Sequence, residues 1–118
     1  MSGMTGPDAV TDATFGKEVR EADRPVLVEF TAAWCPSCRQ MAPVLRALAE
    51  EHGDRLKVVT VDVDTSPATA AAHQVLSIPA FFVYRGGEPV RSLVGARSRR
   101  RLLQELGLDD VMETTALV

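Results

Sequence analysis

The chain has 118 residues, a length that fits one domain. Hydrophobic residues make up 46% of it, which excludes a disordered chain, and the formal net charge of -3 creates no overall field that would attract nucleic acid. No apolar run approaches the ~20 residues that cross a bilayer. The N-terminal stretch MSGMTGPDAVTDATFG lacks the basic and apolar regions of a signal peptide. We therefore expect a cytoplasmic protein without nucleic-acid or membrane partners.

The spacing of the apolar residues predicts the secondary structure in chain order. The first half is expected to hold a short helix over 11–22, a strand buried on both faces over 26–30, and a long helix from Cys35 to a stop at Gly53. The second half is expected to hold a strand over 58–63, a helix over 67–73 capped by Ser66, a hairpin over 80–94 and a last helix over 98–106.

This alternation of strands and helices predicts an α/β fold of one domain. Its central sheet is expected to be mixed and flanked by helices on both faces, with the hairpin as an antiparallel edge. We expect a flexible tail over 1–9, the folded domain over 10–107 and a C-terminal extension over 108–118.

The two cysteines of the chain, Cys35 and Cys38, stand three positions apart in the stretch WCPSC. A zinc site needs four ligands, and the chain adds only His52 and His73. If Cys38 and His52 share a helix, about 21 Å separates them, so they do not bind one ion. A structural disulfide across so short a loop would constrain little of the unfolded chain. The sequence therefore favours a reversible dithiol over a metal site or a structural bridge.

The expected position of the pair gives a physical reason for its reactivity. Cys35 is predicted to be exposed at the start of a helix, where free N–H groups and the helix dipole stabilise a thiolate. This thiolate would attack a disulfide of a partner and form a mixed disulfide. Cys38, one turn further along, would then attack Cys35 and release the reduced partner.

Other motifs surround the cysteines, and together the pattern resembles the thioredoxin family. In chain order these motifs are VLVEF, AAWCPSC, MAPVL, VDVDTSP, SIPAFFVYRGGE and VGA. The resemblance covers roughly residues 10–107. It implies the thioredoxin fold, with Cys35 as the nucleophile and Cys38 as the resolving thiol. It also implies no bound cofactor other than the redox-active disulfide between these two residues.

The resemblance assigns roles to five further residues. Trp34 would flank the dithiol on the surface that meets partners. Pro79 would follow a cis peptide bond, and the backbone of Ile78 would pair with the substrate. Gly95 and Ala96 would complete a shallow apolar groove. The alternatives are a Trp34 that fills the core, a trans Pro79 that opens an edge strand, and a Gly95 that serves only a turn.

Glu29 stands where the family has a buried acid, which is usually Asp. Burial would raise its pKa, and the group would then accept the proton of Cys38 during resolution. The alternative is a surface glutamate on an edge strand. The family often has Lys where Thr60 stands, and without that Lys Glu29 loses a cation that would favour its ionised form.

The dipeptide between the cysteines, Pro36 and Ser37, differs from the usual Gly-Pro of the family. We place both residues on the substrate-binding surface. Pro36 removes one N–H donor, whereas Ser37 adds an N–H and a hydroxyl that would stabilise the reduced form. These effects oppose each other, and we expect a pair that is less reducing than in a standard thioredoxin.

A basic run, Arg97–Arg101, contains four arginines at the start of the last predicted helix. Cations are unfavourable there with respect to the helix dipole. The run is either a solvated face or a basic rim that steers acidic partners.

The sequence thus predicts a monomeric thiol–disulfide oxidoreductase that reduces protein disulfides. The family resemblance implies that its electrons come from thioredoxin reductase, an NADPH-dependent flavin enzyme. One alternative is a thioredoxin-fold binding or chaperone-like subunit with incidental cysteines. Another is an oxidase or isomerase variant, against which the missing signal peptide argues.

Overall fold

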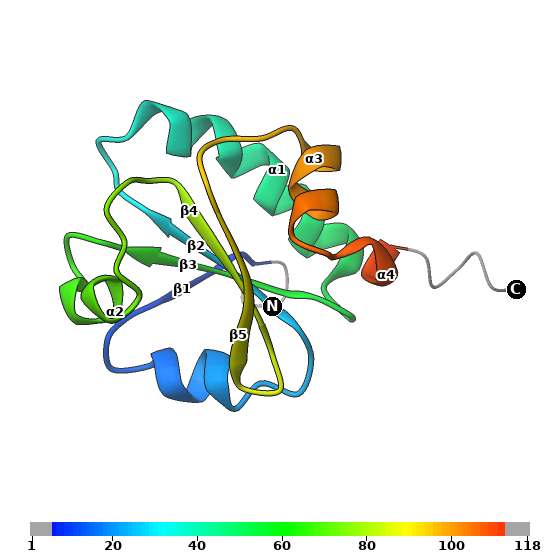
Figure 1. Ribbon diagram of the computed structural model, residues 1–118, viewed down its shortest axis with the longest axis horizontal. Helices are drawn as coiled ribbons and strands as arrows, with labels where there is room; N and C mark the ends of the chain where they lie inside the picture. The colour runs from blue at the N-terminus through cyan, green and yellow to red at the C-terminus, as the bar shows by residue number, and fades with distance from the viewer. Residues whose placement is uncertain (1–5, 113–118) are drawn as a thin grey trace, which may run out of the picture.

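A five-stranded sheet with the order β1-β3-β2-β4-β5 forms the centre of the computed structural model, which describes residues 6–112 (Figure 1). Its strands are β1 (Asp8–Val10), β2 (Val26–Thr31), β3 (Lys57–Asp62), β4 (Ala80–Arg85) and β5 (Glu88–Val94). Strand β3 runs parallel to β1 and β2, whereas β4 is antiparallel to β2 and β5. The strand that precedes the cysteines, β2, therefore lies in the middle of a mixed sheet.

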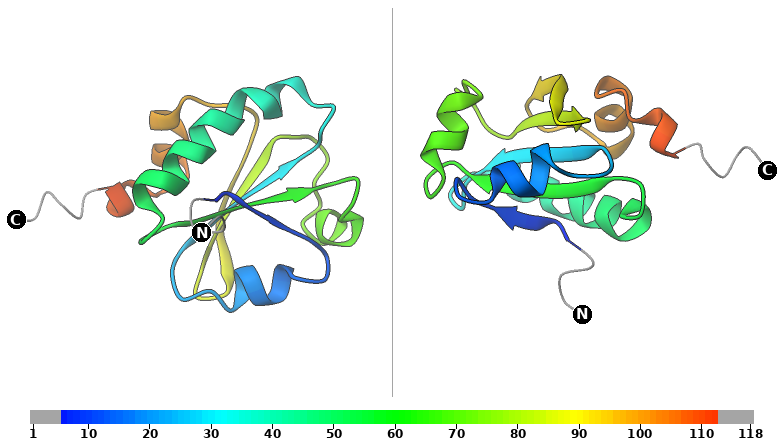
Figure 2. Two further views of the ribbon diagram at one scale, coloured as in Figure 1. Left: turned by 180° about the vertical axis from the view of Figure 1, so that it is seen from behind. Right: turned by 90° about the horizontal axis from the view of Figure 1, so that it is seen from below.

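Helices cover both faces of this sheet, which confirms the predicted fold class. They are η2, a π-helix (Gly16–Arg20), α1 (Pro36–His52), α2 (Pro67–Ala72), α3 (Arg99–Glu105) and α4 (Asp109–Met112). In Figure 1, α1, α3 and α4 lie on one side of the sheet, and α2 lies on the other; Figure 2 shows the same layers from behind and from below. Among residues 6–112, no helix has the length and apolarity needed to cross a membrane.

The alternation of side chains along β2 divides the core into two clusters. Val28 and Phe30 pack in the cluster that includes residues of η2 and α2, whereas Leu27 packs with residues of α1 and α3. All residues of 26–30 are buried, as the sequence predicts for a strand covered on both faces. Glu29 follows the period of Leu27 and so faces α1.

The N-terminal region differs from the sequence prediction in two ways. Asp8, which was expected in a flexible tail, belongs to β1 and pairs with Val59 of β3. The expected helix over 11–22 is a turn followed by the short π-helix η2. Phe15 and Val19 are nevertheless both buried, so the predicted apolar face exists although the helix is shorter.

The cap of α2 also differs from the prediction. Ser66 occupies the N-cap position, but its buried hydroxyl has no hydrogen-bond partner among the described residues. The carboxylate of Asp12 instead accepts hydrogen bonds from the backbone N–H groups of Ala68 at 3.2 Å and Thr69 at 2.8 Å. A carboxylate satisfies these free donors and interacts favourably with the helix dipole, so it replaces the weaker serine cap.

The first residues of the predicted C-terminal extension pack on the domain. Leu108 and Val111 are buried in the same cluster as Leu102 of α3. The end of the extension, 113–118, and the start of the predicted tail, 1–5, lie outside the described residues.

Candidate functional site

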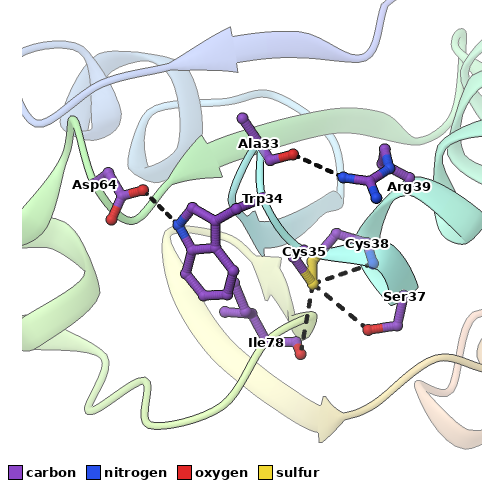
Figure 3. The surroundings of a disulfide bond; sticks show 8 residues. All are labelled: Ala33, Trp34, Cys35, Ser37, Cys38, Arg39, Asp64 and Ile78. Atoms are coloured by element: carbon purple, nitrogen blue, oxygen red, sulfur yellow. Dashed lines mark hydrogen bonds between the residues drawn. A yellow bond between two sulfur atoms is a disulfide. The ribbon is translucent and has the colours of Figure 1, made fainter.

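The cysteine pair lies where β2 leaves the sheet and α1 begins (Figure 3). Cys35 is the N-cap of α1, and Pro36 follows in the first turn, where its missing N–H removes no helical hydrogen bond. The backbone N–H of Cys38 donates to Cys35 Sγ at 3.2 Å. The sulfur of Cys35 therefore takes the place of a capping oxygen at the start of the helix.

Cys35 and Cys38 form a disulfide, with their Cα atoms 5.2 Å apart. Only 3% of Cys35 and 4% of Cys38 are exposed. The expectation of an exposed Cys35 is therefore wrong for the oxidised protein. Its sulfur is bonded to Cys38 and covered by the carbonyl oxygen of Ile78, which lies 3.9 Å away, and the hydroxyl of Ser37 lies 3.5 Å from the same sulfur.

Trp34 covers the side of the site next to the β3–α2 loop. It is 63% exposed, so the alternative of a core-filling Trp34 is wrong. Its indole N–H donates to Asp64 Oδ2 at 2.7 Å (Figure 3). The hydrogen bond holds the ring beside the disulfide.

Asp64 and Arg39 belong to the site, although the sequence analysis did not select them. Asp64 follows β3, and the parallel strands β2 and β3 bring their carboxyl ends to the same edge of the sheet. A polar residue directly after β3 could therefore have been expected near the cysteines, which follow β2. Arg39 Nη1 donates to the carbonyl of Ala33 at 2.9 Å and so ties α1 to the segment before it. No short motif marks Arg39.

The opposite side of the site is formed by the start of β4 and the end of β5. The peptide bond between Ile78 and Pro79 is cis, as the resemblance implies. The N–H of Gly95 donates to the carbonyl of Pro79 at 2.8 Å. Gly95 has a φ of +104°, a backbone conformation that residues with a Cβ rarely adopt, so glycine is favoured there. Ala96 is exposed next to it.

Glu29 lies behind the disulfide, on the α1 face of the sheet. It is 3% exposed, which excludes a surface glutamate, and within residues 6–112 its Oε2 has no hydrogen-bond partner. Burial raises the pKa of Glu29 to about 8, because it disfavours the charged form. A cavity of about 330 Å³ is lined by Glu29, Cys38, Thr60 and Arg39, among others. A carboxylic acid that is largely neutral at pH 7 thus shares a cavity with the second cysteine.

The arginines of the basic run are mostly engaged by carboxylates. Arg97 and Arg101 both pair with Glu105, at 3.1 Å and 2.7 Å, and Arg99 pairs with Glu51 at 2.7 Å. Ser98 Oγ accepts a hydrogen bond from the N–H of Arg101 at 3.3 Å and caps α3 as predicted. Three of the four arginines are thus ion-paired within the chain, two of them with the same carboxylate.

The described residues contain no group of three or more His, Cys, Asp or Glu side chains that would hold a metal ion. Disulfide exchange is the chemistry that the cysteine pair supports, because its first sulfur already accepts a hydrogen bond at a helix N-terminus. The fold and this pair define the class of thiol–disulfide oxidoreductases.

Comparisons with known proteins place the chain within this class. The family model for thioredoxin matches residues 7–107. The chain is 48% identical to a thioredoxin of Streptomyces clavuligerus over 95 residues, which are 80% of this chain and 88% of that protein. It is 46% identical to a thioredoxin of Mycolicibacterium smegmatis over 108 residues, 90% of this chain and 96% of that protein. The chain belongs to the thioredoxin family, and it is a protein-disulfide reductase.

A relative with a different domain content is also similar. The chain is 45% identical over 97 residues to a "Bifunctional thioredoxin reductase/thioredoxin" of Mycobacterium leprae. The match covers 82% of this chain but 21% of that protein, so it concerns one part of a longer polypeptide.

Proposed function

We propose that Cys35 is the nucleophile and Cys38 the resolving thiol in the reduction of protein disulfides. The observation that carries this assignment is the hydrogen bond from the N–H of Cys38 to Cys35 Sγ at the start of α1. In the reduced protein this donor and the helix dipole would stabilise negative charge on Cys35 rather than on Cys38. The hydroxyl of Ser37, 3.5 Å from the same sulfur, would act as a second donor.

The reaction has two exchange steps. The Cys35 thiolate attacks one sulfur of the substrate disulfide, so a bond between Cys35 and that sulfur forms and the substrate S–S bond breaks. The other substrate sulfur leaves as a thiolate and takes a proton from water. The Cys38 thiolate then attacks Cys35 Sγ, which forms the Cys35–Cys38 bond and releases the first substrate sulfur. Two electrons have then passed to the substrate, and the protein is left as a disulfide.

We assign to Glu29 the acceptance of the Cys38 proton before the second step. Its pKa of about 8 keeps most of the carboxyl protonated at neutral pH. Only the ionised fraction acts as a base, and this fraction increases as the pH rises. The cavity that Glu29 and Cys38 both line gives room for a water molecule to carry the proton between them. Thr60 in this cavity supplies no cation that would keep Glu29 ionised.

The substrate would bind across the two sides of the disulfide. We assign to this surface Trp34, Pro36, Ser37, Ile78, Pro79, Gly95 and Ala96. Trp34, Ser37 and Ile78 lie around the disulfide in Figure 3, and Gly95 is hydrogen-bonded to Pro79, which supports the assignment. An extended substrate segment would pair with the backbone of Ile78, whose carbonyl faces Cys35. This arrangement would bring the substrate disulfide close to the reduced Cys35.

The proposed partners follow from the electron balance. Each turnover leaves the cysteine pair oxidised, so an external two-electron donor is required, and we propose a thioredoxin reductase that uses NADPH and a flavin. The bifunctional name of the Mycobacterium leprae relative supports this pairing. We also propose that the protein acts in the cytoplasm as a monomer, on protein disulfides rather than nucleic acid or membranes. Residues 8–112, from β1 to α4, would form the redox domain, because Leu108 and Val111 pack in its core.

Insulin reduction by dithiothreitol tests the assignment of the cysteines. The protein should accelerate the reduction, and Cys35→Ser should abolish the acceleration. Cys38→Ser should react once and accumulate a mixed disulfide with the substrate, visible on a non-reducing gel. Full activity of Cys35→Ser would contradict the assignment. Binding of unfolded insulin without any reduction would instead indicate a chaperone-like subunit.

A further inference from the structure

His73 lies at the end of α2, where the chain enters the loop that leads to β4 (Figure 1). This loop, 74–79, carries Ile78, whose carbonyl oxygen lies 3.9 Å from Cys35 Sγ. Within residues 6–112, no backbone hydrogen bond is donated by three consecutive residues of the loop, Leu76, Ser77 and Ile78. The position of Ile78 therefore depends on how the two ends of the loop are held.

Two hydrogen bonds fix the ring of His73 at the start of the loop. Nδ1 lies 2.8 Å from the carbonyl oxygen of Thr69, and Nε2 lies 2.6 Å from the hydroxyl of Tyr84. Because a carbonyl oxygen only accepts, Nδ1 carries the proton, and Nε2 of the neutral ring accepts from Tyr84. Tyr84 belongs to β4, so this second bond connects the start of the loop to the strand that the loop enters.

Aromatic rings from several elements surround His73. The ring centroids of Phe15, Phe30, Phe82 and Tyr84 lie 4.9 to 5.9 Å from that of His73. The imidazole thus fills a largely apolar space, in which a positive charge would lose hydration.

A cation already lies against this aromatic cluster. Arg20 Cζ is 5.4 Å from the ring centroid of Phe15 and 5.7 Å from that of Tyr84. Burial lowers the pKa of His73, the hydrogen bond to the carbonyl of Thr69 opposes this shift, and Arg20 adds to it. The neutral ring is therefore the form that the surroundings favour.

The acids near the cluster do not compensate a charge on His73. Asp12 accepts hydrogen bonds from the N–H and the hydroxyl of Thr69, at 2.8 Å and 2.6 Å. Glu88, at the start of β5, acts on the hydroxyl of Tyr84, and Glu29 of β2 faces α1 instead. Within residues 6–112, no carboxylate lies at ion-pair distance from His73.

Protonation of His73 would also break its link to β4. When both ring nitrogens carry a proton, Nε2 no longer accepts, and the hydroxyl of Tyr84 loses its acceptor. Tyr84 is 2% exposed, and its hydroxyl has no other hydrogen-bond partner in the part of the chain that the structure describes. A buried donor without an acceptor is costly, so the charged ring would move away from Tyr84 and take the start of the loop with it.

We propose that neutral His73 is a positioning residue for disulfide exchange: it holds Ile78 beside Cys35, and its protonation releases this hold. The inference rests on the proposed function. An extended substrate segment needs the backbone of Ile78, whereas a small disulfide without a peptide backbone needs only the thiolate of Cys35. Acid should therefore slow the reaction with a peptide more than the reaction with a small disulfide.

Oxidation of the reduced protein by two disulfides tests the proposal, with stopped-flow fluorescence of Trp34 as the readout. One is a disulfide-bonded peptide without titratable groups, and the other is bis(2-hydroxyethyl) disulfide, which has no peptide backbone. The Cys35 thiolate attacks both, so the ratio of the two second-order rate constants cancels the ionisation of Cys35. From about pH 8 to about pH 4.5 this peptide-to-small-disulfide ratio should fall at least threefold, with its midpoint at the titration of the His73 ring measured by NMR. A constant ratio would overturn the proposal.

Substitution of the two histidines separates His73 from other acidic effects. His73→Phe keeps an aromatic ring in the cluster but takes up no proton, so its ratio should not vary with pH. The matched control is His52→Gln at the end of α1, where His52 contacts Glu51 and Arg99, and this variant should keep the fall of the natural protein. A fall that persists in His73→Phe, or that disappears in His52→Gln, would overturn the proposal.

Tyr84→Phe tests the same link from β4 and also serves if His73→Phe does not fold. It keeps the ring of Tyr84 and removes the hydroxyl that His73 binds. At about pH 8 its ratio should already lie at least threefold below that of the natural protein, and an unchanged ratio would overturn the proposal. If neither disulfide oxidises the reduced natural protein, the proposed function fails and the role of His73 with it, whereas a pH-independent ratio overturns that role alone.

Discussion

Glu29 and the arginines of 97–101 are ionisable residues in opposite surroundings, the protein interior and the protein surface. Glu29 is buried on the central strand, and its Oε2 has no hydrogen-bond partner in the part of the chain that the structure describes. The arginines lie at the surface, where Glu105 and Glu51 pair with three of them. The sequence suggested a function for both regions: Glu29 as a proton acceptor, and the arginines as a basic rim.

The two kinds of group differ in how strongly they respond to a charge that appears nearby during the reaction. A buried acid without a partner is sensitive to any change of charge nearby, so formation of a thiolate at Cys38 directly affects it. An arginine that is already paired at the surface responds weakly to a partner protein, because water and salt screen it. We therefore expect functional consequences at Glu29 and mainly structural ones at the arginines.

The largest predicted effect is on the pH dependence of stability in Glu29→Gln. Because the pKa of Glu29 is raised from 4.5 to about 8, its carboxyl is ionised in the unfolded chain but protonated in the folded protein between pH 4.5 and about pH 8. The stability of the natural protein falls as pH rises through this window, by about 1.4 kcal/mol per unit, and the variant lacks this loss. Urea unfolding of both oxidised proteins from about pH 5 to about pH 9 measures the difference.

The control for this experiment is Glu88→Gln, which changes a glutamate exposed at the start of β5. This surface substitution should change the free energy of unfolding by less than about 0.5 kcal/mol. If the curves of Glu29→Gln and the natural protein stay parallel, Glu29 ionises in the fold as it does in water, and the contrast with the surface arginines disappears.

The second prediction concerns the rate of resolution in the same variant. Glu29→Gln should slow attack of Cys38 on the mixed disulfide about tenfold to a hundredfold, because the proton acceptor is lost. The first attack by Cys35 should keep its rate. Stopped-flow fluorescence of Trp34 with a small disulfide separates the two steps. In the natural protein the resolution rate should rise with pH towards about 8, where Glu29 ionises.

Glu29→Asp serves as the conservative variant for this prediction. It keeps a carboxyl on the same strand and should recover part of the resolution rate. Unchanged resolution in Glu29→Gln, or equal slowing of both steps, would assign Glu29 a structural role instead.

The burial of Glu29 was predictable because the evidence is local. Apolar residues on both sides of Glu29 indicate a strand covered on both faces, and the structure confirms it. The start of α1 at the cysteines and the hairpin of β4 and β5 were predictable for the same reason, since periodicity and turn residues mark them.

Features that depend on distant contacts were not predictable in this way. Asp12 caps α2 from 57 residues away, and Asp64 holds Trp34 from 30 residues away. The sulfur of Cys35 contacts the carbonyl of Ile78, 43 residues further along the chain. Apolar spacing carries no information on which loops meet, so these contacts require the topology of the sheet.

A smaller effect is expected at Ser37, whose hydroxyl lies 3.5 Å from the sulfur of Cys35. Ser37→Ala should remove a donor to the thiolate and make the pair more reducing by about 20 mV, equivalent to about 1 kcal/mol. Equilibration with glutathione measures the potential. Ser37→Thr keeps the hydroxyl and should stay near the natural value; a shift of Ser37→Ala in the oxidising direction would contradict this role.

The smallest effect is expected at the paired arginines. Arg99→Ala should lower the free energy of unfolding by less than about 1 kcal/mol and change kcat/KM for insulin less than about twofold, because Glu51 already compensates its charge. Arg100→Ala is the matched comparison, since Arg100 forms no ion pair among the described residues. Insulin reduction over a range of salt concentrations compares the two. If insulin reduction depends steeply on salt, and Arg97→Ala or Arg99→Ala removes this dependence, the arginines form a basic rim that steers partners. Ion pairing within the chain would then not separate structural from functional charges in this protein.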